Sequence, residues 1–511
     1  YSDKNFKDDS LILSTTFIHH PGYQITQMII GKYLEKILGN KAIGIQEQNS
    51  IFLNKLFKSY GYDEVYIFKK NNIFKRLKMF ARSKKILSDL KNFDNLINYE
   101  VDKVKIGKIV YEHYIRFTGH PSLNKFNFKI NYFLYKALEY HEYSKEFFKK
   151  NKIKYVLISE KQFMPSSIIF QNALLNKGKI FARVAGPNNV GLRLYNDESE
   201  FYKSRYHFSN EILNDIYKNH LNKVIIYADK ILKNRFSNSK NKDIQDVKNA
   251  DIAFKKKEEF TKKSLCHRLN WDEKKPIVII FDQHYLDGIY DSERLYFKDT
   301  LDWIASTFKE IKKIKNVNWL IKDHPLDPNE HHHAKTTTEK EFKKIIGEIE
   351  HIKLFPNDYS AGLLPQIASA IITSFGTVGI EYPCFGIPCI LSNTSHYSGN
   401  GFTIEPQTKE EYFKYLNNIT NLKKLNSEEI GKAKTFLFLE IIFGRVPMPL
   451  IPNYDITHNF FLKDNSKKFW KKCAELVSNY NVENDKFMNN LEKQIKSNKK
   501  HLVNNNIINY Y

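Results

Sequence analysis

Residues 368–391 of the chain read ASAIITSFGTVGIEYPCFGIPCIL. Ala368–Thr373 is an apolar run of the length of a buried strand, and it delivers Ser374 to a glycine-containing turn. A short helix is predicted to begin near Thr377, and a further strand comes at Ile387–Leu391. A strand, a turn, a helix and a second strand in this order predict a mostly parallel sheet covered by helices, which is the α/β class.

The turn after the first of these strands has the chemistry of an anion site. Gly376 and Gly379 let backbone N–H groups approach an anion, and the hydroxyls of Ser374 and Thr377 can donate as well. The helix N-terminus adds about half a positive charge. Glu381, one turn further on, can accept hydrogen bonds from ribose hydroxyls. The same spacing also fits a plain turn, with Ser374 as the helix cap and Glu381 as a favourable first-turn charge.

Two neighbouring strands are also followed by polar side chains. Asp323-His324-Pro325 comes after the predicted strand Asn318–Ile321, and Asp282-Gln283-His284 comes after Pro276–Phe281. Ligands of open α/β sheets bind beyond the carboxyl ends of the strands, and a histidine there can donate to a phosphate or protonate a leaving group. His324, Pro325 and His284 are therefore candidate donor-site residues, although each also fits an ordinary loop or capping role.

The N-terminal half repeats the alternation of strands and helices. Strands are predicted at Leu11–Phe17, Lys41–Ile45, Glu64–Phe68, Tyr155–Ser159 and Ile180–Val184. His20 comes after the first of these and Glu160 comes after Tyr155–Ser159, so either is a candidate general base for an acceptor hydroxyl, or a surface loop residue. Ala185–Gly191 is predicted to be a mobile loop at the same rim.

These patterns predict two α/β domains in tandem. We expect an N-terminal Rossmann-like domain over residues 1–235, a polar linker over 236–263, a second Rossmann-like domain over 264–420 and a helical tail over 421–511. A solvated helix over Ala250–Lys263 is the alternative to the last part of the linker.

The composition narrows the class of protein. The chain has 511 residues and a formal net charge of +23, but only 10 of its 80 basic residues are Arg, as an AT-rich genome would produce. Dispersed lysines predict attraction to anionic partners and no dedicated nucleic-acid surface. The cysteines form no close pair and the first residues are polar, so we expect no disulfide scaffold, no signal peptide and a cytoplasmic location. His331-His332-His333 resembles a metal cluster in composition only, so we expect a solvated loop and no metal.

At the level of motifs the chain resembles a known group of proteins. IKDHP (321–325) followed by TSFGTVGIEYPCFGIPCIL (373–391) and HYSGNGFTIEPQTKEEY (396–412) resembles bacterial capsule and surface-polysaccharide biosynthesis proteins. These include GT-B glycosyltransferases of the Kdo-transferase-like and sialyltransferase-like groups. The Ser-x-Gly-x-x-Gly-x-Glu arrangement from Ser374 to Glu381 is also similar to the UDP-sugar 2-epimerase relatives of that fold, and Ile106–Arg116 is like the N-terminal half of the capsule proteins.

The resemblance implies two Rossmann-like domains that face a cleft, with C-terminal helices that brace the first domain. It implies that His324 and Ser374 bind the donor phosphate and that Glu381 holds the ribose. It also implies catalysis without a cofactor, a donor such as a CMP-linked sugar, and a transferred sugar such as Kdo or another nonulosonic acid. The acidic residue that acts as general base in the sialyltransferase-like groups has no clear equivalent in this sequence, so Glu160 and His20 remain the candidates for the general base.

The expected function is that of a glycosyltransferase that moves a sugar from a nucleotide-sugar to a surface-glycan or lipid-linked acceptor at the inner membrane face. The lysine-rich segment Phe461–Tyr511, with 10 Lys against 5 Asp and Glu, would hold such an enzyme near anionic lipid. The alternatives are a sugar-nucleotide 2-epimerase or hydrolase of the same fold, and a basic non-enzymatic scaffold.

Overall fold

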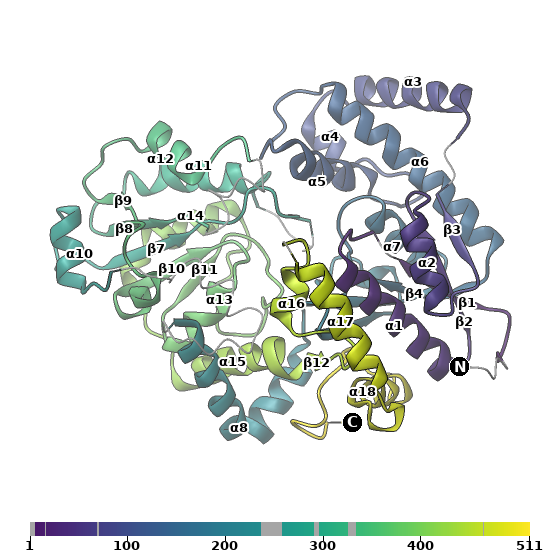
Figure 1. The fold of residues 1–511 in the computed structure, drawn as a ribbon. Helices are drawn as coiled ribbons and strands as arrows, with labels where there is room; N and C mark the ends of the chain where they lie inside the picture. The colour runs from purple at the N-terminus through teal and green to yellow at the C-terminus, as the bar shows by residue number, and fades with distance from the viewer. Residues whose placement is uncertain are drawn as a thin grey trace. The chain divides into compact units, whose positions relative to one another are not determined.

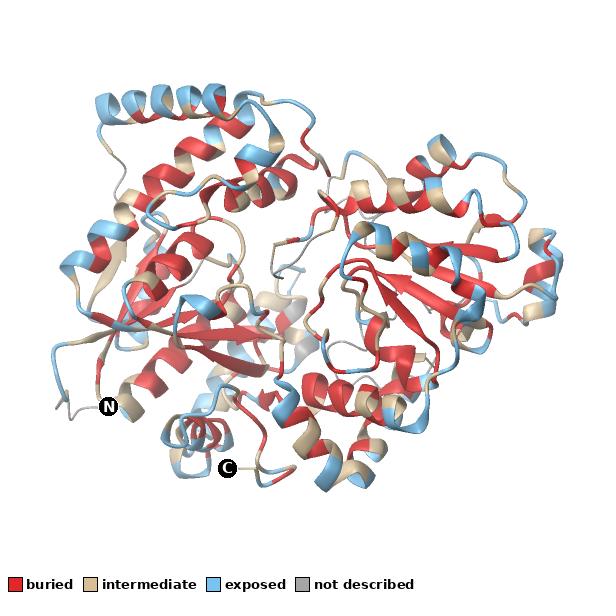
Figure 2. Cartoon of the chain, turned by 180° about the vertical axis from the view of Figure 1, so that it is seen from behind, coloured by how far each residue is buried: buried red, intermediate tan, exposed pale blue. Residues whose placement is uncertain are grey.

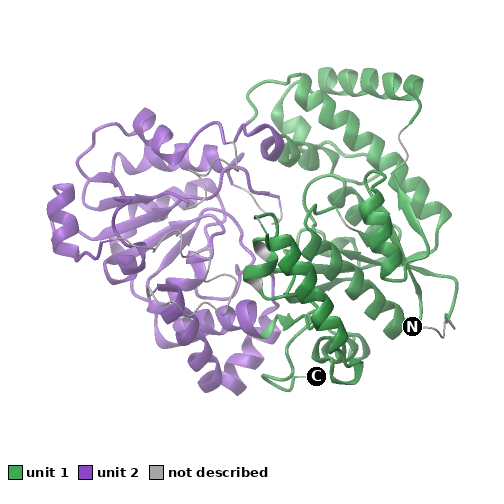
Figure 3. Cartoon of the chain, in the orientation of Figure 1, with its two compact units in different colours: residues 1–114, 123–205, 443–511 green, residues 115–122, 206–442 purple. Residues whose placement is uncertain are grey.

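The computed structural model describes residues 6–15, 17–68, 71–236, 258–290, 296–324, 334–462 and 464–510. The chain forms two compact units (Figure 3). Unit 1 comprises residues 1–114, 123–205 and 443–511, and unit 2 comprises residues 115–122 and 206–442. Compared with the expected domain ranges, residues 115–122 and 206–235 belong to unit 2, and residues 443–511 of the expected tail belong to unit 1. Of the expected linker 236–263, residues 237–257 lie outside the described residues, as do Pro325 and His331–His333.

Unit 1 is built on a seven-stranded sheet with the order β12-β6-β5-β4-β1-β2-β3. The strands from β5 to β3 in that order are parallel to their neighbours, whereas β6 runs antiparallel to both β5 and β12. The strands are β1 (Leu11–Thr15), β2 (Lys41–Gln46), β3 (Val65–Ile67), β4 (Ile153–Ile158), β5 (Lys179–Val184), β6 (Asn189–Tyr195) and β12 (Val446–Pro447). The helices are α1 (Pro21–Leu38), α2 (Ile51–Ser59), α3 (Ile73–Leu90), α4 (Phe93–Ile97), α5 (Ile106–Thr118), α6 (Phe128–Lys150), α7 (Ser166–Leu175), α16 (Tyr454–His458), α17 (Asn465–Ser478) and α18 (Lys486–Lys496).

The first helix of unit 1 shows how local sequence sets the element boundaries. His20 caps α1 because its Nδ1 accepts a hydrogen bond from the Gly22 N–H at 3.2 Å, and Pro21 occupies the first turn, where a missing N–H costs nothing. Gly39 ends the helix with a φ of 72°, a conformation that glycine adopts without a Cβ clash. His20 and Pro21 therefore fix the point at which the chain leaves β1 and enters α1.

The C-terminal segment completes unit 1. The Leu502 N–H donates to the Leu192 carbonyl at 2.8 Å, and the Leu194 N–H donates to the Lys500 carbonyl at 2.7 Å, so residues 500–502 extend the sheet edge beside β6. Phe469 of α17 and Phe487 of α18 belong to the same hydrophobic core as β1 and α1. The tail is mainly helical, as predicted, and it is a structural part of unit 1.

The prediction of a mobile loop over Ala185–Gly191 is wrong for its last three residues, whereas residues 185–188 connect β5 to β6 without regular secondary structure. β6 begins at Asn189 and pairs with β5, with Gly191 opposite Val184. A Cβ at Gly191 would overlap the Gly444 carbonyl and the Val184 side chain. The glycine that suggested a loop is therefore needed for close packing of strands.

Unit 2 is built on a five-stranded sheet with the order β11-β10-β7-β8-β9, in which all neighbours are parallel. The strands are β7 (Ile277–Phe281), β8 (Asn318–Lys322), β9 (Ile352–Leu354), β10 (Ala368–Thr373) and β11 (Cys389–Leu391). The helices are α8 (Asn210–Phe236), α10 (Lys262–Leu269), α11 (Thr300–Ile311), α12 (Thr338–Ile345), α13 (Val378–Glu381), α14 (Lys409–Asn417) and α15 (Ser427–Phe438), and a π-helical segment spans Leu439–Phe443.

Helices cover both faces of the unit 2 sheet (Figure 1). α11, α12 and α14 share one hydrophobic core with β7, β8 and β10, which includes the fully buried Trp303 and Trp319. α13 packs on β10 and α15, and α15 in turn packs on α8. The strands are buried on both faces (Figure 2), as their continuous apolar sequences predict.

The predicted α/β class is confirmed: the sheet of unit 1 is mostly parallel, the sheet of unit 2 is fully parallel, and each is covered by helices. The predicted cleft concerns the placement of one unit against the other and stays a prediction. No helix within the described ranges is long and apolar enough to cross a lipid bilayer.

Candidate functional site

The candidate site of unit 2 lies at the carboxyl edge of its sheet. β8 and β9 lie on one side of β7, whereas β10 returns to the other side, so the junction of β7 and β10 is a topological switch point. His324, His284 and Ser374 lie within three residues of the ends of the adjacent strands β8, β7 and β10. Since neighbouring strands lie about 4.8 Å apart, the strands that deliver His324 and Ser374 are about 10 Å apart, with β7 between them.

The structure brings His284 and His324 into contact. Their ring centroids are 5.7 Å apart, and the rings meet edge to face at 82°. His284 is only 1% exposed, and its Nδ1 accepts a hydrogen bond from the Leu286 N–H at 3.1 Å, which places the proton of the neutral ring on Nε2. His324, which is half-buried and follows β8, therefore packs against a ring, that of His284, whose orientation is fixed.

Ser374, which follows β10, is oriented by a hydrogen bond from Asn393, which follows the neighbouring strand β11. Its side chain is 1% exposed, and its Oγ accepts a hydrogen bond from Asn393 Nδ2 at 2.8 Å. Asn393 lies just beyond β11, and its Oδ1 accepts the Tyr296 N–H at 3.0 Å, which fixes the orientation of the amide. Because Ser374 is an acceptor toward Asn393, its own hydroxyl proton is left for another acceptor.

The two glycines of the turn make room for protein side chains. A Cβ at Gly376 would lie 2.6 Å from Gln283 Nε2, which donates to Thr373 Oγ1 at 3.0 Å. A Cβ at Gly379 would overlap the Tyr397 ring, whose hydroxyl donates to the Gly376 carbonyl at 2.8 Å. The turn is thus clamped from both sides by Gln283 and Tyr397, which occupy the space on the Cβ side of the two glycines. Binding of an anion by the backbone N–H groups of this turn stays a prediction.

Arg235, at the end of α8, contacts Glu381 of α13 and Thr377, the residue that precedes α13. Its Nε lies 2.6 Å from Glu381 Oε1, and its terminal nitrogen donates to Thr377 Oγ1 at 3.0 Å. Glu381 is 2% exposed, so its carboxylate is compensated inside the protein by the guanidinium. Glu381, predicted to hold the ribose of a donor, therefore has an ion-pair partner within the protein. The hydroxyl of the exposed Thr377 keeps a proton that it can donate.

Two carboxyl groups lie between the strand ends and the histidines in the chain, Asp282 after β7 and Asp323 after β8. Asp282 is 3% exposed and accepts hydrogen bonds from the Gln283 N–H at 2.7 Å and from the Thr338 hydroxyl. Burial, and then the charge of Asp323, raise the pKa of Asp282 to about 7, against the hydrogen bonds that lower it. Burial also raises the pKa of Asp323, the residue between β8 and His324. The site therefore contains carboxyl groups that hold protons more strongly than an exposed aspartate.

The two candidate bases of unit 1 are occupied by structural contacts. His20 caps α1, and its ring lies 5.4 Å from that of Phe461 and 5.5 Å from that of Tyr23. Glu160 Oε1 accepts the Lys161 N–H at 3.1 Å and lies 3.1 Å from a guanidinium nitrogen of Arg205. Both residues lie at carboxyl ends of strands, as predicted, but neither lines a hollow that opens at the ends of β1 and β2.

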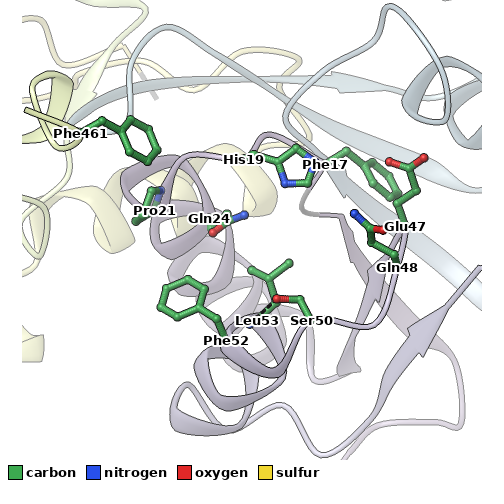
Figure 4. A pocket seen from close by; sticks show the side chains of 10 residues that line it. All are labelled: Phe17, His19, Pro21, Gln24, Glu47, Gln48, Ser50, Phe52, Leu53 and Phe461. Atoms are coloured by element: carbon green, nitrogen blue, oxygen red, sulfur yellow. Dashed lines mark hydrogen bonds between the residues drawn. The ribbon is translucent and has the colours of Figure 1, made fainter. Parts of the chain in front are cut away.

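This hollow has a volume of about 270 Å³. Its wall is part aromatic and part polar, and consists of Phe17, His19, Pro21, Gln24, Glu47, Gln48, Ser50, Phe52, Leu53 and Phe461. Phe52 and Phe461 lie on one side, opposite Phe17 and Glu47 (Figure 4). Gln24 is only 5% exposed, and no described residue hydrogen-bonds to its side-chain amide. A nearly buried amide in the wall of a hollow is suited to bind a polar ligand.

Four residues of these sites, Arg235, Gln283, Asn393 and His19, were not among the candidates that the sequence suggested. Arg235 and Glu381 are far apart in the chain, and Arg235 falls at the end of the range expected to form the first domain. Gln283 and His19 each stand beside a candidate residue, and Asn393 lies just beyond a predicted strand. The rule that ligands bind at strand carboxyl ends, applied to β11 as well, would have found Asn393. Among the described residues, no three His, Cys, Asp or Glu side chains gather as a metal site.

The comparisons with known proteins are distant. No protein-family model matches the chain, and no curated protein sequence matches it. Among solved structures, the chain is similar to the UDP-GlcNAc 2-epimerase of Neisseria meningitidis bound to UDP-GlcNAc, at 12% identity over 84% of this chain and 98% of that one, with a TM-score of 0.27. It is also similar to the Thermosulfurimonas dismutans KpsC β-Kdo 2,4 transferase, at 12% identity over 56% of this chain and 79% of that one, with a TM-score of 0.33. A Rickettsia africae glycosyltransferase matches at 13% identity over 93% and 100% of the two chains, with a TM-score of 0.27. Likenesses this weak say nothing about the activity of this chain.

Proposed function

We propose that the protein is a glycosyltransferase that moves a sugar from a nucleotide-sugar donor onto a glycan acceptor. The observation that carries the proposal is the convergence of His284, His324 and Ser374 at the carboxyl edge of one parallel sheet, beside its switch point. The motif resemblance of residues 321–412 to surface-polysaccharide enzymes supports the same class of reaction.

The donor phosphate binds at the turn after β10. The hydroxyl of Ser374, oriented by Asn393, and the hydroxyl of Thr377 donate to its oxygens. The Arg235 guanidinium offsets the charge of Glu381, so a phosphate meets no uncompensated carboxylate at α13. The ribose role of Glu381 requires that it contact the donor while it remains paired with Arg235.

His324 assists departure of the nucleotide. As the bond from the sugar to the phosphate oxygen breaks, negative charge develops on that oxygen, and an imidazolium or imidazole N–H can stabilise it or transfer a proton to it. His284 holds the ring of His324 from one side, which limits the orientations that the general acid can adopt.

The acceptor sugar binds in the hollow of unit 1. The rings of Phe17, Phe52 and Phe461 offer apolar faces to a pyranose, and the Gln24 amide and the Glu47 carboxylate offer hydrogen bonds to its hydroxyls. His19 lines this hollow, whereas its neighbour His20 caps α1. We therefore place the general base at His19 in preference to His20, which caps α1, and to Glu160, which pairs with Arg205.

The first test is transfer of a radiolabelled sugar by the whole protein from a panel of nucleotide-sugars to extracted surface glycan. Ser374→Ala is expected to weaken donor binding by about 10- to 100-fold, since one hydrogen bond to a charged group is lost. His324→Ala is expected to lower turnover by about 10²- to 10⁴-fold and to change donor affinity much less. The exposed His267→Ala and Ser88→Ala are the matched controls and should retain full activity.

Product analysis separates transfer from its alternatives. Free or epimerised sugar formed at the full rate without any acceptor would replace the transferase by a hydrolase or 2-epimerase that uses the same donor site. Salt-sensitive nucleic-acid binding with no nucleotide-sugar binding would instead support a basic scaffold. Full transfer by both the Ser374 and the His324 variants would refute the site.

A further inference from the structure

Helix α3 lies on the outside of unit 1 and is attached along one face only (Figure 1). Met79, Ser83 and Leu87, spaced by four residues, are its buried positions. They face α6, where the Ser83 hydroxyl donates to Asn131 Oδ1 at 2.9 Å. The outward face of the helix is exposed along its whole length (Figure 2).

The first part of that outward face is apolar. Ile73 is 60% exposed, Phe74 is 80% exposed and Leu77 is 61% exposed. Ile73 and Leu77 lie one turn apart on the same side, with Phe74 beside them, so the three side chains form one continuous patch. Single exposed apolar residues are common on soluble proteins, but three large ones within one helical turn mark a contact surface.

Cations surround this patch. α3 carries six Lys and Arg residues and a single acidic residue, Asp89. Lys75 and Arg82 lie 3.2 and 3.7 Å from Glu142 of α6 and so belong to the attached side of the helix. Lys78, Lys84 and Lys85 are exposed, and within the described ranges no carboxylate forms an ion pair with them.

We propose that α3 docks this protein on an anionic lipid surface. Ile73, Phe74 and Leu77 would enter the boundary between headgroups and acyl chains, while Lys78, Lys84 and Lys85 contact lipid phosphates. An interfacial helix combines an apolar patch with basic residues in this way, and its binding strengthens with buried apolar area and with anionic lipid. A second copy of the chain is a poor occupant, because the same lysines would face one another. The inference does not depend on the proposed glycosyltransferase activity.

This surface differs from the lysine-rich tail that the sequence suggested. On the tail, Phe487, Met488 and Leu491 of α18 are buried in unit 1. Phe461 lines the hollow of unit 1, so its exposure has a separate explanation. Ile51 and Phe52 of α2 are exposed neighbours as well, but they are two residues against the three of α3, and Phe52 lines the hollow of unit 1.

The test is flotation of the full chain with vesicles of 30% phosphatidylglycerol in phosphatidylcholine, and with vesicles of pure phosphatidylcholine. The wild type is expected to float with the anionic vesicles and to bind the neutral ones at least tenfold more weakly. The triple variant Ile73→Ser, Phe74→Ser, Leu77→Ser should lose at least tenfold in partition coefficient. Lys78→Gln, Lys84→Gln, Lys85→Gln should lose about 100-fold at low salt and less at high salt, since each lysine near the surface contributes about fivefold.

The matched control is Phe461→Ser, Leu462→Ser, Val477→Ser, which removes exposed apolar side chains of the tail and should change binding less than twofold. Circular dichroism establishes that each variant is folded. Three results would overturn the proposal: no flotation of the wild type, wild-type flotation of the α3 apolar variant, or an equal loss in the tail variant. Loss of a dimer in the α3 variant, with no vesicle binding by the wild type, would assign the patch to self-association instead.

Discussion

At the scale of single residues, the site of unit 2 depends on groups that are nearly removed from water. Asp282, His284, Ser374 and Glu381 are each at most 3% exposed. Each has a named hydrogen-bond or ion-pair partner, namely Thr338, Leu286, Asn393 and Arg235 respectively. Such groups cannot reorient freely, so the edge of the sheet offers a ligand a fixed pattern of donors and acceptors.

The Asp282→Asn variant tests the protonation of this edge. Burial raises the pKa of Asp282 from 3.8 to about 7, so between those values the folded protein holds a proton that the unfolded chain releases. The resulting stabilisation is complete below pH 3.8 and is lost as the pH rises through about 7, at up to about 1.4 kcal/mol per pH unit. Urea unfolding from about pH 4.5 to pH 6.5 should show a smaller decline for Asp282→Asn than for the wild type. Exposed Asp89→Asn is the control, and a pH-independent difference between Asp282→Asn and the wild type would contradict the assignment.

The residues that could be predicted from sequence are those that come directly after a recognisable strand. His324, His284 and Ser374 are of this kind, because parallel strands deliver the residues at their carboxyl ends to one edge of the sheet. The pairing of Glu381 with Arg235 could not be predicted, since it joins α13 to a helix distant in the chain and carries no local pattern. The preference for His19 over His20 as a site residue could not be predicted either. Only the structure shows that the His20 side chain caps α1, whereas the His19 side chain lines the hollow.

At the scale of elements, strands were easier to predict than the turns and edges between them. Ala368–Thr373 has the predicted bounds, because a buried parallel strand is a continuous apolar run. β6 was not predicted because the sequence Gly186-Pro187-Asn188-Asn189 is typical of a loop. The close approach of Gly191 to Gly444 is a tertiary contact that the local sequence does not indicate. Neither β12 nor its pairing with β6 has a strong pattern, since β12 consists of Val446 and Pro447 alone.

The packing of α1 is tested by a double-mutant cycle. A Cβ at Gly31 would overlap the Tyr62 hydroxyl oxygen, which donates to the Met28 carbonyl at 3.0 Å, whereas the next nearest atom of the ring lies at 3.3 Å. Gly31→Ala should therefore destabilise the protein by about 1–3 kcal/mol. Tyr62→Phe alone should cost about 1 kcal/mol. The double variant should be more stable than the Gly31→Ala variant, because the clash with the hydroxyl oxygen is removed. In addition, alanine favours a helix over glycine by about 1 kcal/mol.

The control for that cycle is Gly107→Ala, whose Cβ would meet the Leu96 carbonyl of the backbone. Tyr62→Phe cannot relieve that clash, so these two changes should be additive in the free energy of unfolding. Additive behaviour of Gly31→Ala with Tyr62→Phe would contradict the packing of α1 against Tyr62.

At the scale of the whole molecule, the two ends of the chain belong to one unit. Tyr33 of α1 hydrogen-bonds to Asp485, and its hydroxyl lies 3.0 Å from that of Tyr480. Phe487 of α18 is fully buried in the core that contains β1 and α1. The helices of the tail bury their apolar sides in this unit, as Phe487, Met488 and Leu491 of α18 show.

Phe487→Ala tests the role of the tail. Truncation of a fully buried phenylalanine should lower the free energy of unfolding by about 3–5 kcal/mol. Hydrogen exchange should speed up in α1, β1 and β2, and remain unchanged in β7 to β11, which belong to unit 2. The control is Val477→Ala on α17, which is 59% exposed and should cost less than about 0.5 kcal/mol. Equal effects of Phe487→Ala on exchange in both units would contradict the assignment of the tail to unit 1.

The central claim, a nucleotide-sugar site at the carboxyl edge of β7, β8 and β10, is tested most directly by calorimetric titration of the whole protein with CMP, CDP, UDP and GDP. One of these nucleotides should bind to the wild type and to His267→Ala with the same affinity, and bind about 10- to 100-fold more weakly to Ser374→Ala. Absence of binding by all four nucleotides, or equal binding by Ser374→Ala, would contradict the claim.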